Sequence, residues 1–243
     1  MNHTTVSQKL YRVGIIGCGW IAIKAPDNHL KAYQENSNTE MVALCDNDIW
    51  RIPYGGAEYT EYMDMVKKEN LDIVSVCTPV ETHYKIVTDI VPYVKAIYCE
   101  KPMATTIEEC DRMIGVCHKH GVILQINHQR HFTLPRITFS RNIIDTGTHV
   151  FDKLRQLFGE GTHLRDNLWM FGRQMVEVNY IKSDEYLLEF DCLHTREPMI
   201  PLGVQHLVEC LNEGEQSISS GEDGREALRL ALKFKEIYET SYS

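Results

Sequence analysis

The chain has 243 residues, enough for one large domain or two modest ones. With 43% hydrophobic and 24% charged residues it has the composition of an ordinary globular protein. Its 25 Lys and Arg against 34 Asp and Glu give a net charge of −9, and no basic run stands out, which disfavours nucleic acid and anionic membranes as partners.

The polar start, residues 1–12, shows no apolar signal-peptide core, and no stretch is long and apolar enough for a membrane span. Eight cysteines are scattered along the chain, several of them inside apolar strand-like runs, where a reduced thiol acts as a small hydrophobic side chain. We therefore expect reduced cysteines and a cytoplasmic protein, in preference to a disulfide framework or a zinc site.

Short apolar runs alternate with helix-compatible segments in the first half of the chain. The strand-like runs are 11–17, 41–46, 71–77, 96–99 and 122–127. The helix-compatible segments are 20–35, 61–69, 83–91 and 106–121. In the last of these, Thr106 and Glu109 have the spacing of a capping box, and Gly121 is placed to end the helix. Nearly continuous apolar strands between helices predict an α/β fold whose parallel sheet is covered on both faces.

The pattern changes after about residue 130, where we place a domain boundary. Residues 143–159 favour a helix that Gly159 ends. The segments 173–181 and 185–193 alternate apolar and polar residues, which predicts an antiparallel hairpin, with one more strand within 162–171. Two helices finish the chain, at 202–212 and from about Glu222, and we expect the last one to pack back near the first domain.

A glycine motif follows the first strand-like run, in the sequence VGIIGCGWIA. Gly17 and Gly19 permit a tight turn that lets the backbone approach a pyrophosphate, which the N-terminus of the next helix attracts, and Ala22 takes the third position of the fingerprint. The motif is weak alone, but its strand–turn–helix context supports it. Asp46 ends the second strand, where a carboxylate can bind ribose hydroxyls and repel a 2′-phosphate. This favours NAD over NADP, with a solvated aspartate as the alternative.

These features predict a Rossmann dinucleotide-binding domain at residues 1–130 and a reduced α+β domain with a small antiparallel sheet at 131–243. Thr78 and Pro79 end the third strand and His83 follows one helical turn later. Because open α/β sheets bind ligands beyond the carboxyl ends of their strands, this loop should face the cofactor, although an ordinary loop is an equal alternative for His83. Lys101 leaves the fourth strand at the same edge, where a desolvated lysine can donate to a substrate hydroxyl and assist proton transfer.

A helix over 143–159 would place Asp145, His149 and Asp152 along one face. A histidine beside a carboxylate suits acid–base chemistry near neutral pH. A capping residue at the helix start with a surface histidine is the equal alternative.

Two other groups of residues invite a functional interpretation. Cys110, Cys117, His118 and His120 resemble metal ligands, but cationic residues are favoured at a helix C-terminus, so we expect no metal there. Arg130, just after the last parallel strand, is a weaker candidate for contact with substrate or cofactor.

Five motifs occur in the order typical of one family. They are the Gly17, Gly19 and Ala22 turn, CDND at 45–48, TPVETH at 78–83, CEKPMATTIEEC at 99–110 and DTGTHVFD at 145–152. In this respect the chain resembles the Gfo/Idh/MocA family, named for glucose–fructose oxidoreductase and inositol dehydrogenase. The match is dense over 12–132 and 143–159, and residues 219–232 resemble the family's closing helix. The Glu-Lys-Pro motif paired with Asp-x-x-x-His is more specific than the glycine turn.

The resemblance implies an NAD(H)-dependent dehydrogenase that acts on a secondary alcohol of a sugar, nucleotide-sugar or cyclitol. Lys101 and His149 would then be catalytic, with Asp145 as their companion. The residues expected to contact the cofactor are Gly17, Gly19, Trp20, Ile21, Ala22, Asp46, Thr78, Pro79, His83, Glu100 and Lys101.

The chain also departs from the family pattern. Between Phe132 and Asp145 the family carries several dozen more residues, including a strand, and the later sheet is here expected to be little more than the hairpin. A non-catalytic NAD(H)-binding regulator or partner subunit is therefore the alternative function. The mixed apolar and charged outer face expected for the hairpin predicts a homo-oligomer, most simply a dimer.

Overall fold

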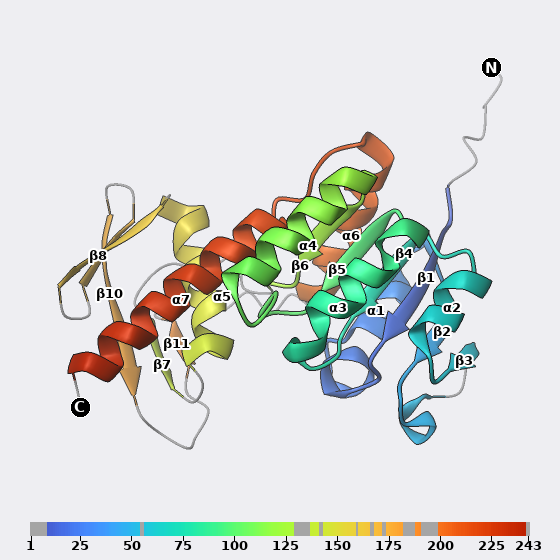
Figure 1. Ribbon diagram of the computed structural model, residues 1–243, viewed down its shortest axis with the longest axis horizontal. Helices are drawn as coiled ribbons and strands as arrows, with labels where there is room; N and C mark the ends of the chain where they lie inside the picture. The colour runs from blue at the N-terminus through green and yellow to red at the C-terminus, as the bar shows by residue number, and fades with distance from the viewer. Residues whose placement is uncertain are drawn as a thin grey trace.

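The computed structural model describes residues 9–53, 56–128, 137–140, 143–158, 160–165, 168–171, 174–181, 188–190 and 199–241. In the second half several side chains lie outside this description, those of Asp145 and His149 among them. The described chain forms two sheets linked by long helices, with the first sheet and its helices at one end and the second sheet at the other (Figure 1).

The first sheet has six parallel strands in the order β3-β2-β1-β4-β5-β6. The strands are β1 (Tyr11–Ile16), β2 (Thr39–Cys45), β3 (Ala57–Tyr59), β4 (Ile73–Val76), β5 (Ala96–Cys99) and β6 (Ile123–Ile126). All five expected strands are confirmed, and β3 was missed because three residues are too few to show a period. Since the chain returns to the middle of the sheet after β3, the strand order reverses between β1 and β4, and a crevice opens at the carboxyl ends of these two strands.

Helices cover both faces of this sheet. One face packs against α2 (Tyr62–Lys68), α3 (Val80–Ile90) and α4 (Ile107–His120), and the other against α1 (His29–Glu35) and α6 (Met199–Glu213). Short 3-10 turns lie at Ile49–Arg51 and Val91–Tyr93, and the second contains Pro92 directly after the end of α3. The capping box of α4 is confirmed, because the Thr106 side chain accepts a hydrogen bond from the Glu109 N–H and the Glu109 side chain accepts one from the Thr106 N–H.

The two C-terminal helices return to the first sheet. On α6, Gly203 lies against the ring of Tyr98, and its carbonyl accepts a hydrogen bond from Gln125 Nε2 at 2.9 Å. The long helix α7 (Gly221–Ser241) runs beside α4 and α5 (Figure 1), and its Ala227, Leu230, Ala231 and Phe234 are buried. The expected return of the last helix is confirmed, whereas the boundary near residue 130 stays a prediction.

The second sheet has five strands in the order β11-β7-β10-β9-β8. They are β7 (Ile137–Ser140), β8 (Gly161–Arg165), β9 (Leu168–Phe171), β10 (Gln174–Ile181) and β11 (Leu188–Phe190). The expected hairpin of β10 with β11 is wrong, because β7 lies between them, parallel to β10 and antiparallel to β11. The sheet is also larger than expected, with two strands in place of one over 161–171 and a strand in the stretch before Asp145 where we expected none.

The alternation of apolar and polar residues in β10 and β11 nevertheless places apolar residues of neighbouring strands on one face. Val178, Ile137 and Phe190 stand in one cross-strand row, and Tyr180, Phe139 and Leu188 stand in another. The pattern therefore predicted which face each residue takes but not which strands are neighbours. Val178 is fully buried. None of the described helices is both long and apolar enough to cross a membrane.

Candidate active site

Gly17 and Gly19 form the turn after β1, beside the end of β4. Gly17 has φ +90°, and a Cβ there would lie 2.7 Å from the Cys77 carbonyl oxygen and 2.9 Å from Thr78 Cγ2. Only glycine fits this position without a backbone shift. A Cβ on Gly19, in contrast, would meet no described atom within 4 Å. The turn therefore leaves open space at Gly19, the second glycine of the fingerprint, where a pyrophosphate must approach the backbone closely.

The helix expected over 20–35 is two separate pieces. A five-residue π-helix spans Trp20–Lys24, and α1 begins only at His29. Pro26 explains the break, because its ring disfavours helical geometry at Ala25, which is extended with ψ 149°. Asn28 then caps α1 by accepting the Lys31 N–H at 2.9 Å. The prediction of one continuous helix was wrong, and the short π-helix aligns fewer peptide dipoles toward a phosphate than a long α-helix would.

Asp46 binds the glycine turn from the end of β2. Its side chain is buried, Oδ2 accepts the Cys18 N–H at 2.8 Å and Oδ1 accepts the Asp48 N–H at 2.9 Å. A solvated aspartate is therefore the wrong interpretation. Because each carboxylate oxygen can accept more than one hydrogen bond, these two contacts leave acceptor capacity for a ribose hydroxyl.

His83 joins two loops at the carboxyl edge of the sheet. It lies near the start of α3 and is buried, with Nε2 2.8 Å from the Thr78 carbonyl oxygen and Nδ1 3.0 Å from the Pro102 carbonyl oxygen. Thr78 is half-buried and Pro79 exposed. The histidine thus fixes the loop after β4 against the loop after β5, whereas its contact with a cofactor stays a prediction.

Lys101 follows β5 at this edge and is half-buried, whereas the preceding Glu100 is buried in the protein. Glu100 Oε1 lies 3.0 Å from His29 Nε2 and 2.5 Å from Asn127 Nδ2, and Oε2 accepts the Lys101 N–H at 3.2 Å. The pKa of Glu100 is lowered from its ordinary value. Burial alone would raise it, but this effect is outweighed by the hydrogen bond and charge of His29, the hydrogen bond of the Asn127 amide and the charge of Lys101.

Sequence analysis missed both partners of Glu100. Asn127 follows β6 at the same carboxyl edge, so the rule that located Lys101 could have found it. His29 gives no such signal, because it is an interior residue of the single helix predicted over 20–35.

Helix α5 (Ile143–Phe158) confirms that Asp145, His149 and Asp152 belong to one helix. Asp152 is buried, and its Oδ1 lies 3.3 Å from His128 Nδ1, just beyond β6. Ser219, before α7, places its Oγ 3.4 Å from the same nitrogen. These contacts bring α5 to the carboxyl edge that carries Lys101. Arg130 lies outside the described residues.

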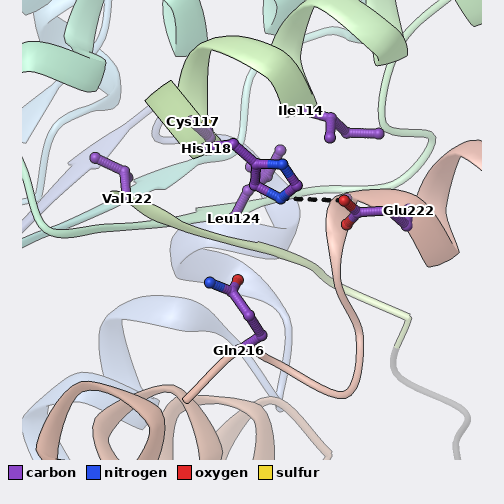
Figure 2. A pocket seen from close by; sticks show the side chains of 8 residues that line it. Ile114, Cys117, His118, Val122, Leu124, Gln216 and Glu222 are labelled. Atoms are coloured by element: carbon purple, nitrogen blue, oxygen red, sulfur yellow. Dashed lines mark ion pairs between the residues drawn. The ribbon is translucent and has the colours of Figure 1, made fainter. Parts of the chain in front are cut away.

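A small hollow lies beside β6, the outermost strand of the sheet, between the end of α4 and the start of α7 (Figure 2). His118 and Glu222 form an ion pair of 3.1 Å beside it, and Val122 lines it at the start of β6. His118, one of the residues that resembled metal ligands, therefore has a carboxylate partner. Within the described residues no group of three or more His, Cys, Asp or Glu is placed to hold a metal ion.

The strand order, the open turn at Gly19 and the acidic residue at the end of β2 define a dinucleotide-binding Rossmann protein. A family model described as "Oxidoreductase family, NAD-binding Rossmann fold" matches residues 11–128. Over these residues the chain belongs to this family, the Gfo/Idh/MocA oxidoreductases.

Curated relatives are about a quarter to a third identical to the chain over the aligned residues. D-apiose dehydrogenase of Paraburkholderia graminis is 26% identical over 257 residues, covering 86% of this chain and 67% of that enzyme. D-xylose 1-dehydrogenase [NADP(+)] of Haloarcula marismortui is 31% identical over 150 residues, covering 59% and 41%. Inositol 2-dehydrogenase of Salmonella typhimurium is 28% identical over 145 residues, covering 56% and 42%. The chain thus spans about two fifths of the length of the last two relatives.

Solved structures share the fold at low sequence identity. A probable dehydrogenase from Thermotoga maritima has a TM-score of 0.76 at 19% identity, covering 95% of this chain and 97% of that chain. The WlbA dehydrogenase from Bordetella pertussis, in complex with NADH and UDP-GlcNAcA, has a TM-score of 0.72 at 17% identity, covering 96% and 98%. The likeness extends over both sheets.

Proposed function

We propose that the chain is an NAD(H)-dependent oxidoreductase that moves a hydride between nicotinamide and a secondary alcohol or ketone of a sugar, nucleotide-sugar or cyclitol. The observation that carries this proposal is the position of Lys101. It lies at the carboxyl edge, in a turn that His83 ties to the loop beside Gly17. The relatives named as sugar and inositol dehydrogenases support the substrate class.

The open space at Gly19 and the acceptor capacity of Asp46 fit a dinucleotide. Gly17, Gly19, Trp20, Ile21 and Ala22 would hold its pyrophosphate side, Asp46 its ribose, and the loops of Thr78, Pro79, His83, Glu100 and Lys101 its nicotinamide side. When bound, nicotinamide would supply the hydride acceptor or donor.

The chain's own residues would handle the proton. In the oxidative direction His149 takes the hydroxyl proton while the Lys101 ammonium donates to the same oxygen and stabilises its developing charge. Asp145 orients the pair, and in reduction the same groups return the proton. Residues His128 and Asp152 support this arrangement, because they hold α5 at the edge that carries Lys101.

We propose that NAD(H) is preferred over NADP(H). The Asp46 carboxylate is buried at the end of β2, and a 2′-phosphate beside it would meet a like charge with little water to screen it. Titration of the protein with NADH and NADPH, followed by cofactor fluorescence, tests the preference. Tighter NADPH binding would contradict it.

The reaction is tested by screening NAD-linked turnover against pentoses, cyclitols and nucleotide-sugars, and then comparing two lysine variants. Lys101→Met should abolish turnover and largely preserve NADH binding. Lys95→Met is the matched control, because Lys95 lies just before the other end of β5 and is exposed beside Asp72. Cofactor binding without turnover on any of these substrates would instead indicate a non-catalytic regulator or partner subunit.

We also propose that the chain forms a homo-oligomer, most simply a dimer through the second sheet. The sheet has five strands, a broader surface than the expected hairpin. Light scattering at micromolar concentration tests this, and a mass of 28.1 kDa would contradict it.

A further inference from the structure

A buried polar network lies directly beneath Lys101. Its members come from the start of α1, from β4 and β5, and from the end of β6, and all are less than a tenth exposed: His29, Tyr33, Ser75, Tyr98, Glu100 and Asn127. Buried polar groups are costly unless they are hydrogen-bonded, so six of them in contact require a complete set of partners.

The centre of this network is the Glu100 carboxylate. It accepts from His29 Nε2 and Asn127 Nδ2 through one oxygen, and from the Lys101 backbone N–H through the other. The Asn127 oxygen in turn accepts the Tyr98 hydroxyl at 2.7 Å. Because its hydrogen-bond donors include the backbone N–H of Lys101 itself, the carboxylate fixes the point where the Lys101 side chain leaves the strand.

His29 is held just as firmly from its other side. Its Nδ1 lies 3.1 Å from Ser75 Oγ, which also contacts the Tyr33 hydroxyl at 2.9 Å. The ring of Tyr98 packs against the imidazole with a centroid separation of 4.9 Å. The imidazole therefore has one orientation, in which Nε2 points at Glu100.

We propose that His29 is a positioning residue that acts on Lys101 through Glu100, and this proposal rests on the function proposed above. His29 orients the Glu100 carboxylate, and that carboxylate fixes the backbone and supplies a negative charge beneath the Lys101 ammonium. Lys101 is in this way held in place and aligned at the carboxyl edge before substrate arrives.

The test compares three substitutions of His29. His29→Gln retains an N–H donor that can reach Glu100, His29→Asn has a donor that is too short, and His29→Leu has none. Tyr11→Phe is the control for loss of a buried hydrogen bond, since the Tyr11 hydroxyl donates to Asn212 at 2.8 Å near the other end of the sheet. His29→Asn serves if His29→Leu fails to fold.

Two readouts separate positioning from general stability. The first is the rate of amine acylation at Lys101 relative to Lys95, read by mass spectrometry in one sample, which needs no substrate. The second is kcat and KM with the substrate found in the screen. We expect His29→Leu and His29→Asn to raise the Lys101 labelling ratio severalfold and to lower kcat about 10–100-fold with little change in KM. His29→Gln should stay near wild type.

Equal labelling ratios for His29→Leu, His29→Asn and Tyr11→Phe would overturn the proposal. So would an unchanged kcat in an active protein. If the wild-type protein shows no turnover, the proposed function fails, and the labelling ratio alone still decides whether His29 positions Lys101.

Discussion

His128 Nδ1 and Asp152 Oδ1 lie 3.3 Å apart, and both side chains are only 2% exposed. This pair joins the end of β6 to the helix that carries Asp145 and His149. Asp152→Asn keeps the size of the side chain and removes its charge. We expect it to lower the free energy of unfolding by about 1–3 kcal/mol, because the buried interaction with His128 becomes weaker. We also expect a lower kcat, because α5 loses its alignment.

Urea denaturation and steady-state kinetics measure these two effects. Glu160→Gln is the matched control, because Glu160 forms an exposed ion pair with Arg155 of the same helix and should change stability by less than about 0.5 kcal/mol. Equal unfolding midpoints for the two variants would contradict the prediction.

Asp46→Asn should shift cofactor preference toward NADP(H). The substitution removes the charge that opposes a 2′-phosphate, but it also replaces one of the oxygens that accept the Cys18 and Asp48 N–H groups. We therefore expect weaker NADH binding together with a smaller ratio of NADH to NADPH affinity, both measured by calorimetric titration. Glu40→Gln, at the amino end of the same strand, is the control. A preference unchanged from wild type would show that Asp46 acts only on the glycine turn.

Two glycine substitutions in helices should have opposite effects on stability. Gly203→Ala places a methyl group against the Tyr98 hydroxyl between α6 and the sheet, and should destabilise the fold by about 1–3 kcal/mol through overpacking. Gly115→Ala in α4 meets no described atom within 4 Å and should stabilise by about 0.5–1 kcal/mol through helix propensity. Thermal unfolding distinguishes the two. A loss of stability in Gly115→Ala, or none in Gly203→Ala, would contradict the described surroundings of these two glycines.

The buried cysteines should resist alkylation at neutral pH. Burial, and then the charge of Asp46, raise the pKa of Cys18 to about 12, and burial above all raises that of Cys45 to about 12. Since the thiolate is the reactive form, both thiols should react slowly with iodoacetamide at pH 8 and rapidly in guanidinium. Peptide mass mapping of the two samples measures this. Fast modification of Cys18 in the folded protein would contradict the described burial of the turn.

The stability that Glu100 provides should depend on pH in a defined direction. Although burial alone raises its pKa, contacts with His29 and Asn127 hold the pKa below the ordinary value of 4.5. A carboxyl group with a lowered pKa in the folded state contributes stability that is complete above about pH 4.5 and is lost as pH falls through the folded pKa. The difference in urea midpoint between wild type and Glu100→Gln should therefore be constant near neutral pH and shrink in acid. A difference that does not change down to pH 3 would contradict this.

The first sheet and its edge were largely predictable from the sequence, because local signals decide them. Apolar runs mark the strands, the capping box marks the start of α4, and the rule for open α/β sheets locates Lys101. His29 was not predictable in the same way. Its partner Glu100 is 71 residues away in the chain, and no local pattern reports a contact at that separation.

Two errors have separate physical causes. The break at Pro26 could have been predicted, since proline disfavours a helix at the preceding residue. The insertion of β7 between β10 and β11 could not, because a period of two fixes the face of each residue while strand order depends on packing against α5 and on the path of the chain.

Helix α6 has a consequence for the order in which the protein can fold during synthesis. Ile200, Val204 and Leu207 pack on the face of the first sheet that carries Tyr98 and Ile123, so only α1 covers part of this face when β6 leaves the ribosome. The nucleotide-binding half must wait for nearly the whole chain to be translated before its surface is closed. A fragment that stops near residue 130 should therefore bind hydrophobic dyes and chaperones and fail to behave as an independent domain.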